Sequence, residues 1–303
     1  MTFADQRQAV LLAPPGQERL PDFARGWRRA DGTIEPFLSY VDEGHAVNWS
    51  DDLEELHEES SRSHFIDVWT RGAMLARLGS LPSAPVIADL GCSTGYLLED
   101  LRVALPGATL VGVDLIGSGL RKAHANVPEA RLVQADLGAL PLEDASVDAV
   151  VSANVLEHVP DDQTALVEVR RVLRPGARAV LVVPAGPGIY DYYDRFLGHE
   201  RRYGRGELAG RARRTGLEVL EDMHLGSLIY PAFWLVKRRN RRRYDHLQGA
   251  DLEARVSRDI ERTRDSRLGD TTCHLERLLL ERGIRLPFGI RSLVVVRRPA
   301  SGG

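Results

Sequence analysis

Four polar side chains stand at, or just beyond, the ends of short apolar runs in the middle of the chain. They are Asp89, Asp114, Asp136 and Asn154. If the apolar runs are parallel strands, their carboxyl ends meet at one edge of the sheet, where open α/β sheets bind their ligands. The residue types and their places therefore predict one ligand site built by four consecutive strands.

A turn of small residues follows Asp89 and opens a helical pattern, with the sequence Gly91-Cys92-Ser93-Thr94-Gly95. Small residues let the backbone approach a ligand closely, and a helix N-terminus offers free N–H groups. Ser93 and Tyr96 occupy the second and third glycine positions of the dinucleotide fingerprint, and no Gly-Lys-Ser/Thr of a P-loop follows. Asp114 lies 25 residues after Asp89, close to the roughly 20 expected for an acid that binds ribose hydroxyls.

The elements that must position these residues alternate along the chain. Apolar runs predict strands at 86–90, 109–113, 130–134, 147–152, 177–183, 217–222 and 291–298. Helical patterns lie at 64–78, 97–105, 119–126, 161–173 and 207–215, and Pro175-Gly176 is expected to stop the helix at 161–173. This alternation indicates βαβ units around a parallel sheet with both faces covered. The predicted fold class is α/β, a Rossmann-like, seven-stranded, mostly parallel, doubly wound sheet with a helical cap or insert.

The segments outside this alternation suggest four parts of the chain. We expect an N-terminal cap at 1–62, a core at 63–224, a helical insert or lid at 225–288, and a final core strand and tail at 289–303. The cap is expected to be irregular apart from a short helix at 50–61. The insert contains an apolar stretch, 225–236, directly before a basic run in which six of seven residues, 237–243, are Lys or Arg.

Composition excludes several classes of protein. The net charge of −3 argues against a dedicated nucleic-acid binder. Two cysteines exclude a disulfide-stapled secreted domain and favour a reducing compartment, the cytoplasm. No apolar run approaches the roughly 18 residues of a membrane span, and the N-terminus lacks the pattern of a signal peptide.

Together, the motifs resemble the class I S-adenosylmethionine (SAM)-dependent methyltransferases with small-molecule acceptors. The resemblance covers about residues 66–222 and the final strand. It implies SAM as cofactor, S-adenosylhomocysteine as product, in-line methyl transfer and no metal. It also implies that Asp89, Gly91, Ser93 and Gly95 line the methionine end of SAM, and that Arg71 pairs with its carboxylate.

The resemblance assigns the nucleoside end of SAM to the next three strand ends. Asp114 takes both ribose hydroxyls, and Leu115 packs near the adenine. Asp136 accepts a hydrogen bond from the adenine amino group, with Leu137 beside it, while Asn154 and Val155 border the sulfonium. The family usually has glycine where Ser93 stands, and a serine with positive φ there would be strained by about 1 kcal/mol or more.

Candidate bases come from two places. Glu157 and His158 follow the fourth strand, and the stretch 190–203 contains Tyr193 and His199. A histidine titrates near neutral pH and suits proton removal from an acceptor. His158 has an alternative structural role. Likewise, Arg201 or Arg202 either clamps an acceptor carboxylate or phosphate, or pairs with Asp194 to hold the loop in place.

The acceptor itself is not encoded in any motif. A small organic molecule, such as a natural-product intermediate, is the favoured acceptor. The segment 225–236 is best interpreted as a buried lid helix; alternatively, it contacts a membrane surface and takes a lipid-linked or glycan acceptor. A non-methylating SAM enzyme stays open. RNA methylation and a nicotinamide-dependent reaction are disfavoured by the charge and by the failed glycine pattern.

Overall fold

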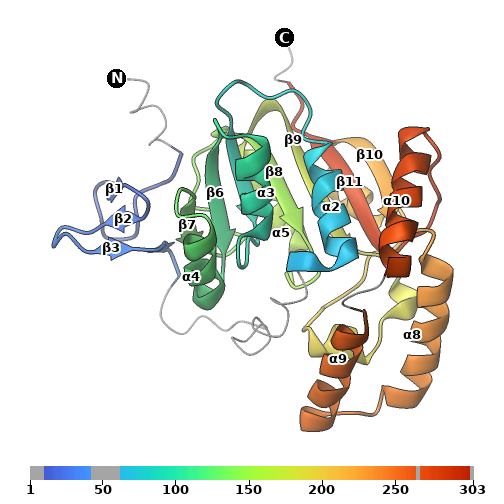
Figure 1. Ribbon diagram of the computed structural model, residues 1–303. Helices are drawn as coiled ribbons and strands as arrows, with labels where there is room; N and C mark the ends of the chain where they lie inside the picture. The colour runs from blue at the N-terminus through green and yellow to red at the C-terminus, as the bar shows by residue number, and fades with distance from the viewer. Residues whose placement is uncertain (1–9, 42–61, 264–266, 301–303) are drawn as a thin grey trace.

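The computed structural model describes residues 10–41, 62–263 and 267–300. Its centre is an eight-stranded sheet with the order β10-β11-β9-β8-β5-β6-β7-β4, flanked by helices on both faces (Figure 1). The β9-β8-β5-β6-β7-β4 part is parallel, and β11 pairs antiparallel with both β9 and β10. The α/β, Rossmann-like, mostly parallel fold class is therefore confirmed.

Most strands coincide with the predicted apolar runs. The central strands are β5 (Val86–Leu90), β6 (Thr109–Asp114), β7 (Arg131–Gln134), β8 (Val147–Ala153), β9 (Leu173–Pro184), β10 (Glu218–Leu225) and β11 (Arg291–Arg297). The helices are α2 (Phe65–Leu75), α3 (Tyr96–Ala104), α4 (Gly117–Asn126), α5 (Asp162–Val172), α6 (Tyr192–Phe196), α7 (Glu207–Arg214), α8 (Tyr230–Tyr244), α9 (Gly249–Thr263) and α10 (Arg267–Glu281).

Two hydrophobic layers hold the helices to the sheet. Alternate residues of β5 point to opposite faces, as the period of two in a strand requires. Ile87 packs in the layer that contains α2, α3 and α4, whereas Ala88 packs in the layer that contains α5 and α7. The parallel strands are buried along nearly their whole length. Residues at the strand ends are consequently fixed in place by a rigid core.

The N-terminal segment adds strands that the sequence did not predict. Short strands β1 (Asp22–Phe23), β2 (Trp27–Arg28) and β3 (Ile34–Glu35) form a small antiparallel sheet, and β4 (Leu38–Ser39) pairs with β7 as an eighth strand of the main sheet. The prediction of seven strands was wrong because two-residue strands have no periodicity to detect. The helix predicted at 50–61 lies outside the described residues.

The boundary between α5 and β9 also differs from the prediction. The helix ends at Val172, and the strand begins at Leu173, which is already extended at φ −63° and ψ 136°. Proline disfavours helical backbone at the residue before it, here Arg174, and the chain is already extended one residue earlier, at Leu173. The strand then passes through Pro175-Gly176 with an irregular register against β8.

The segment between β10 and β11 is helical, and α8 and α9 lie at the lower right of Figure 1. Among the described residues, no helix is long and apolar enough to cross a bilayer. The interpretation of 225–236 as a buried lid helix was wrong. Leu225 ends a strand, and α8 starts only at Tyr230, with Trp234, Leu235 and Val236 exposed.

Candidate functional site

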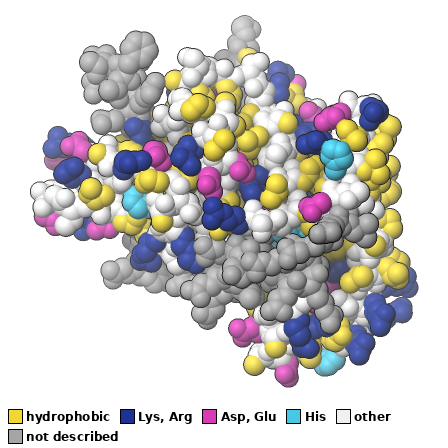
Figure 2. Space-filling view, in the orientation of Figure 1, with side chains coloured by type: hydrophobic (Ala, Val, Ile, Leu, Met, Phe, Trp, Pro, Cys, Tyr) yellow, Lys and Arg dark blue, Asp and Glu magenta, His cyan; other side chains and the backbone are white. Residues whose placement is uncertain are grey.

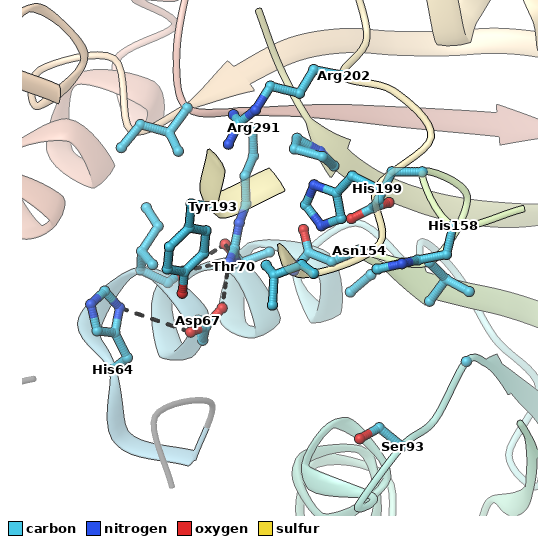
Figure 3. Close-up of a pocket in the computed structure, with 18 of the residues that line it drawn as sticks. His64, Asp67, Thr70, Ser93, Asn154, His158, Tyr193, His199, Arg202 and Arg291 are labelled. Carbon is cyan, nitrogen blue, oxygen red and sulfur yellow. Dashed lines mark hydrogen bonds and ion pairs between the residues drawn. The ribbon is translucent and has the colours of Figure 1, made fainter. Parts of the chain in front are cut away.

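A cavity of about 1290 Å³ opens at the carboxyl ends of β5, β6, β7 and β8. Part of its wall is made by the loops that follow these strands, and other parts by α2, the loop around His199, and α8. Figure 3 shows Thr70 of α2 and His199 among the lining side chains. Every residue predicted to bind the cofactor lines this cavity except Gly95, which caps α3 with φ +83°. His158, Tyr193 and His199 line it as well.

The turn after β5 has little room for side chains. Gly91 has φ +78°, and a Cβ on it would lie 2.1 Å from Cγ2 of Val155. Ser93 also has a left-handed backbone, φ +44°, which is strained for an L-residue with a side chain. Its N–H donates to Oδ2 of Asp114 at 2.7 Å. That hydrogen bond holds the strained turn against the end of β6.

The Asp114 carboxylate accepts one backbone hydrogen bond on each oxygen. Ser93 donates to Oδ2 at 2.7 Å, and the N–H of Ile116 donates to Oδ1 at 2.9 Å. Asp114 also lines the cavity, and a carboxylate accepts hydrogen bonds through both of its oxygens. This arrangement fits a ligand that presents two adjacent hydroxyl groups.

Asp89 is a buried carboxyl group that lines the cavity and is 2% exposed. Its Oδ2 has no hydrogen-bond partner among the described residues. Burial, helped by the nearby charge of Asp114, raises the pKa of Asp89 to about 8. A cationic ligand group placed here would satisfy Oδ2, and the ammonium of the methionine end of SAM has that charge. The narrow glycine turn, Asp114 and Asp89 together fit SAM.

The remaining residues predicted to bind SAM complete the same wall. Oδ1 of Asp136 accepts from the N–H of Gly138 at 2.7 Å, and Leu115 and Leu137 line the cavity nearby. Asn154 has φ +56°, a conformation that asparagine tolerates better than most residues. The backbone at the end of β8 is thereby turned toward the cavity (Figure 3).

Arg71 reaches the cavity from α2, but it also makes contacts within the protein. Its Nε lies 2.6 Å from Oδ2 of Asp100, and another guanidinium nitrogen donates to the carbonyl of Arg62. These contacts fix the guanidinium at the cavity wall. A carboxylate of a bound ligand would have to share Arg71 with Asp100.

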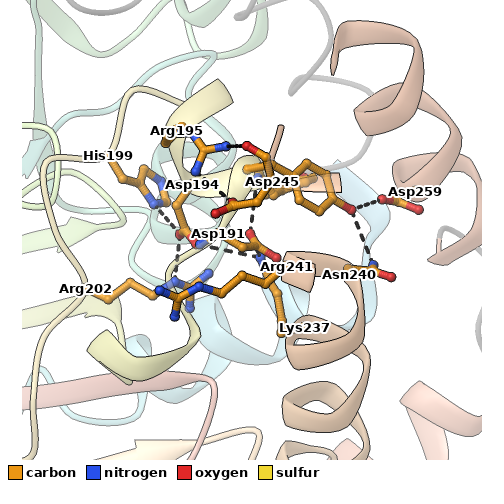
Figure 4. A network of polar contacts seen from close by, with 12 residues as sticks. Asp191, Asp194, Arg195, His199, Arg202, Lys237, Asn240, Arg241, Asp245 and Asp259 are labelled. Atoms are coloured by element: carbon orange, nitrogen blue, oxygen red, sulfur yellow. Dashed lines mark hydrogen bonds and ion pairs between the residues drawn. The ribbon is translucent and has the colours of Figure 1, made fainter. Parts of the chain in front are cut away.

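The acceptor side of the cavity contains an Asp–His pair (Figure 4). Nδ1 of His199 lies 2.9 Å from Oδ1 of Asp194. Burial lowers the pKa of His199, so the imidazole is neutral near pH 7. Burial alone would raise the pKa of Asp194, but His199, Arg202 and Lys237 hold it well below its usual value. An ionised carboxylate only accepts, so Nδ1 of His199 carries the proton and Nε2 keeps its lone pair.

His158 and Glu157 lie beside this pair. The His158 and His199 rings meet edge to face, with centroids 4.8 Å apart. Glu157 is fully buried, both its carboxyl oxygens lack a partner among the described residues, and burial raises its pKa to about 8. One ligand atom from each of Glu157, His158 and His199 lies within 4.8 Å of the others. Of the described residues, these three could hold a metal ion.

The hydroxyl of Tyr193 points toward Asp67 (Figure 3). Burial and the nearby charge of Asp67 raise its pKa well above the usual value for a phenol. Tyr193 is therefore a neutral hydrogen-bond donor at neutral pH. Its catalytic role stays a prediction.

Comparison with known proteins identifies the sheet-side half of the cavity. Residues 88–181 match the family model described as "Methyltransferase domain". The match runs from β5 into β9 and includes the four strand ends that line the cavity.

The chain contains a class I methyltransferase domain, whose cofactor is SAM.

Relatives and solved structures agree with this assignment. The chain is 34% identical over 183 residues to an uncharacterized 37.1 kDa protein in transposon TN4556 of Streptomyces fradiae, covering 59% of this chain and 49% of the relative. It is 38% identical over 118 residues to the demethylmenaquinone methyltransferase of Thermus thermophilus, covering 38% and 53%. The chain thus spans about half the length of the curated relatives it matches.

The fold of a solved methyltransferase is similar over most of the chain. Phosphoethanolamine N-methyltransferase 2 of Haemonchus contortus, solved in complex with S-adenosyl-L-methionine, superposes with a TM-score of 0.59 at 15% identity. The superposition covers 86% of this chain and 61% of that one. At this identity the likeness concerns the fold.

Two cations on the cavity wall, both outside residues 88–181, were missed by sequence reasoning. Lys237, one of only two lysines in the chain, is 8% exposed, and its Nζ lies 2.7 Å from Oδ1 of Asp191. Arg291, on β11, pairs with Asp67 and donates to Oγ1 of Thr70 at 2.7 Å. Both lie far in sequence from their partners. The only available signal was a lysine in a chain whose other basic residues are nearly all arginine.

Arg201 and Arg202 hold the loop that contains His199. Arg201 donates to the carbonyls of Val159 and Pro160, and Nε of Arg202 donates to Asp194 at 2.7 Å. Arg202 is nearly buried and lines the cavity. The loop is thus held by Asp194 pairing with an arginine, which was one of the two readings that the sequence left open.

Proposed function

We propose that this protein transfers the methyl group of SAM to a hydroxyl group of a small organic acceptor. The observation that carries the proposal is the single cavity that joins the methyltransferase strand ends to the Asp194–His199 pair. A base with a free Nε2, facing a cofactor cradle, fits a nucleophile that must lose a proton when it attacks. An amine acceptor would need no such base.

In this proposal His199 removes the acceptor proton, and Asp194 orients the imidazole and stabilises the imidazolium that forms. SAM, when bound, supplies an electrophilic methyl group on a sulfonium. The acceptor proton passes to Nε2 of His199 while the proton on Nδ1 stays hydrogen-bonded to Asp194. Because charge is dispersed as the methyl moves, a closed and dry site favours the reaction, and alignment supplies much of the rate.

The walls of the acceptor half support an amphipathic acceptor. Phe233 and Val236 line the cavity from α8, next to Ile229 just before the helix. Arg239 and Arg243 line it further along α8. An acceptor with an apolar body and an anionic group would match both the apolar and the basic part of this wall. A natural-product intermediate is one molecule of this kind. We place the reaction in the cytoplasm, where the buried, free thiols of Cys92 and Cys273 stay reduced.

The test is a methyl-transfer screen with labelled SAM and a panel of amphipathic alcohols and phenols. His199→Gln should lower turnover by about 10²-fold or more, as expected for loss of a general base, and should leave SAM affinity within about twofold. His246→Gln is the matched control because His246 is exposed and outside the cavity. Unchanged turnover in His199→Gln would exclude the base assignment. Transfer to amines alone would exclude O-methylation.

A further inference from the structure

The outer face of α8 carries apolar side chains that no other described element covers. Trp234 is 38% exposed and its neighbour Leu235 is 62% exposed. Single exposed apolar residues are ordinary on a protein surface, but two in succession, including a tryptophan, indicate an interaction site. Tyr230, at the start of α8, stacks near the 39%-exposed Phe288 at a centroid distance of 5.6 Å, so the apolar surface continues toward β11.

The second half of the same helix is strongly basic. It contains Arg238, Arg239, Arg241, Arg242 and Arg243. Within the described part of the chain, none of these five forms an ion pair with a carboxylate, although sixteen other arginines do, such as Arg195 with Asp245. All five are exposed in the second half of α8, where Arg238 stacks over the Trp234 ring at 5.1 Å. Arg239 and Arg243 also line the cavity.

The two halves make α8 complementary to one kind of surface. In the space-filling view, apolar and basic side chains gather along the right-hand side, over the region of α8 and α10 (Figure 2). An apolar patch followed by unpaired arginines fits an interface where apolar side chains enter the acyl boundary and cations meet lipid phosphates. A nucleic acid would pair with the arginines but would leave Trp234 and Leu235 exposed to water.

We propose that α8 docks this protein on the surface of an anionic lipid bilayer, with Trp234 and Leu235 in the interface and the arginines at the headgroups. The opposite face of α8, with Phe233 and Lys237, lines the cavity. Docking would therefore place the acceptor half of the cavity next to the bilayer. The proposal does not depend on methyl transfer, because binding to vesicles is measured without cofactor or acceptor.

The test is flotation of the full-length chain with vesicles of phosphatidylcholine alone, or of phosphatidylcholine mixed with phosphatidylglycerol. We expect flotation with the mixed vesicles only, weakened by salt. Trp234→Ser with Leu235→Ser should lower the partition coefficient by about tenfold or more. Arg238→Gln with Arg242→Gln should lower it by about fivefold for each arginine.

Matched controls come from other surfaces. Val103→Ser with Val167→Ser removes apolar side chains that are 74% and 49% exposed elsewhere, and Arg213→Gln with Arg214→Gln removes exposed cations of α7; neither pair should change flotation. Equal flotation with both vesicle types, or α8 variants that float like the wild type, would overturn the proposal. The proposal would also be overturned if the protein did not float and instead formed a dimer that Trp234→Ser with Leu235→Ser dissociated. In that case α8 would be an interface between two copies of the chain.

Discussion

Removing the Asp114 carboxylate should weaken SAM binding by two to four orders of magnitude. The carboxylate lines the cavity and accepts from the N–H groups of Ser93 and Ile116, at 2.7 and 2.9 Å. Two hydrogen bonds from ribose hydroxyls to a charged acceptor contribute about 1.5–3 kcal/mol each. Their joint loss in Asp114→Ala is about 3–6 kcal/mol, or roughly 10²- to 10⁴-fold in Kd.

The assay is calorimetric titration with S-adenosylhomocysteine, which has the same ribose and does not react. Asp114→Asn keeps one acceptor oxygen and should lie between the wild type and Asp114→Ala. Asp144→Ala is the control, because the Asp144 side chain is 77% exposed and pairs with Arg171 away from the cavity. A Kd for Asp114→Ala within about threefold of the wild-type value, with unchanged thermal stability, would show that Asp114 does not bind the ribose.

Three further changes test other parts of the site. Ser93→Gly should raise the free energy of unfolding by about 1 kcal/mol, because it relieves a residue at φ +44°; a lower melting temperature would contradict this. The pKa of Asp89, raised to about 8 in the folded protein by burial, means that the folded state retains a proton which the unfolded state loses above about pH 4. The stability that Asp89 contributes is thus complete below about pH 4 and is lost as pH rises to about 8. In urea titrations without ligand, Asp89→Asn should reduce the fall of the unfolding free energy with pH by up to about 1.4 kcal/mol per pH unit. If the wild type and Asp89→Asn show the same pH dependence, Asp89 does not carry this proton. Lys237→Met removes a cation that helps lower the pKa of His199. The pKa of His199 should therefore rise, and the acid limb of the pH–rate profile should move to higher pH. Reduced turnover with an unmoved acid limb would indicate that Lys237 is purely structural.

The sheet was predictable from sequence because its strands are nearly continuous apolar runs, and the wrong boundaries have local causes. The end of α5 was placed one residue too late because the chain becomes extended at Leu173, ahead of Pro175. The strand β4 was missed because it owes its pairing to β7 and not to any pattern of its own. The strand-end residues could be placed together because parallel topology brings them to one edge.

The acceptor half was less predictable because its contacts join distant segments. Lys237 meets Asp191 across 46 positions, and Arg291 meets Thr70 across 221. Neither pairing leaves a spacing that a single sequence displays. The φ of Ser93 was likewise undecided from sequence, since the residue type favours negative φ and only the turn imposes a positive one. The prediction of a buried helix at 225–236 failed because apolarity alone does not say which face a helix buries.

Titration of the purified wild-type chain with SAM, S-adenosylhomocysteine and NAD in a calorimeter tests the cofactor assignment without knowledge of the acceptor. The cavity formed by Asp89, the Gly91 turn and Asp114 predicts saturable binding of both adenosyl compounds, with Kd values of about micromolar order, and no heat from NAD. Binding of NAD, or the absence of binding by both adenosyl compounds, would contradict the cofactor site and with it the proposed methyl transfer.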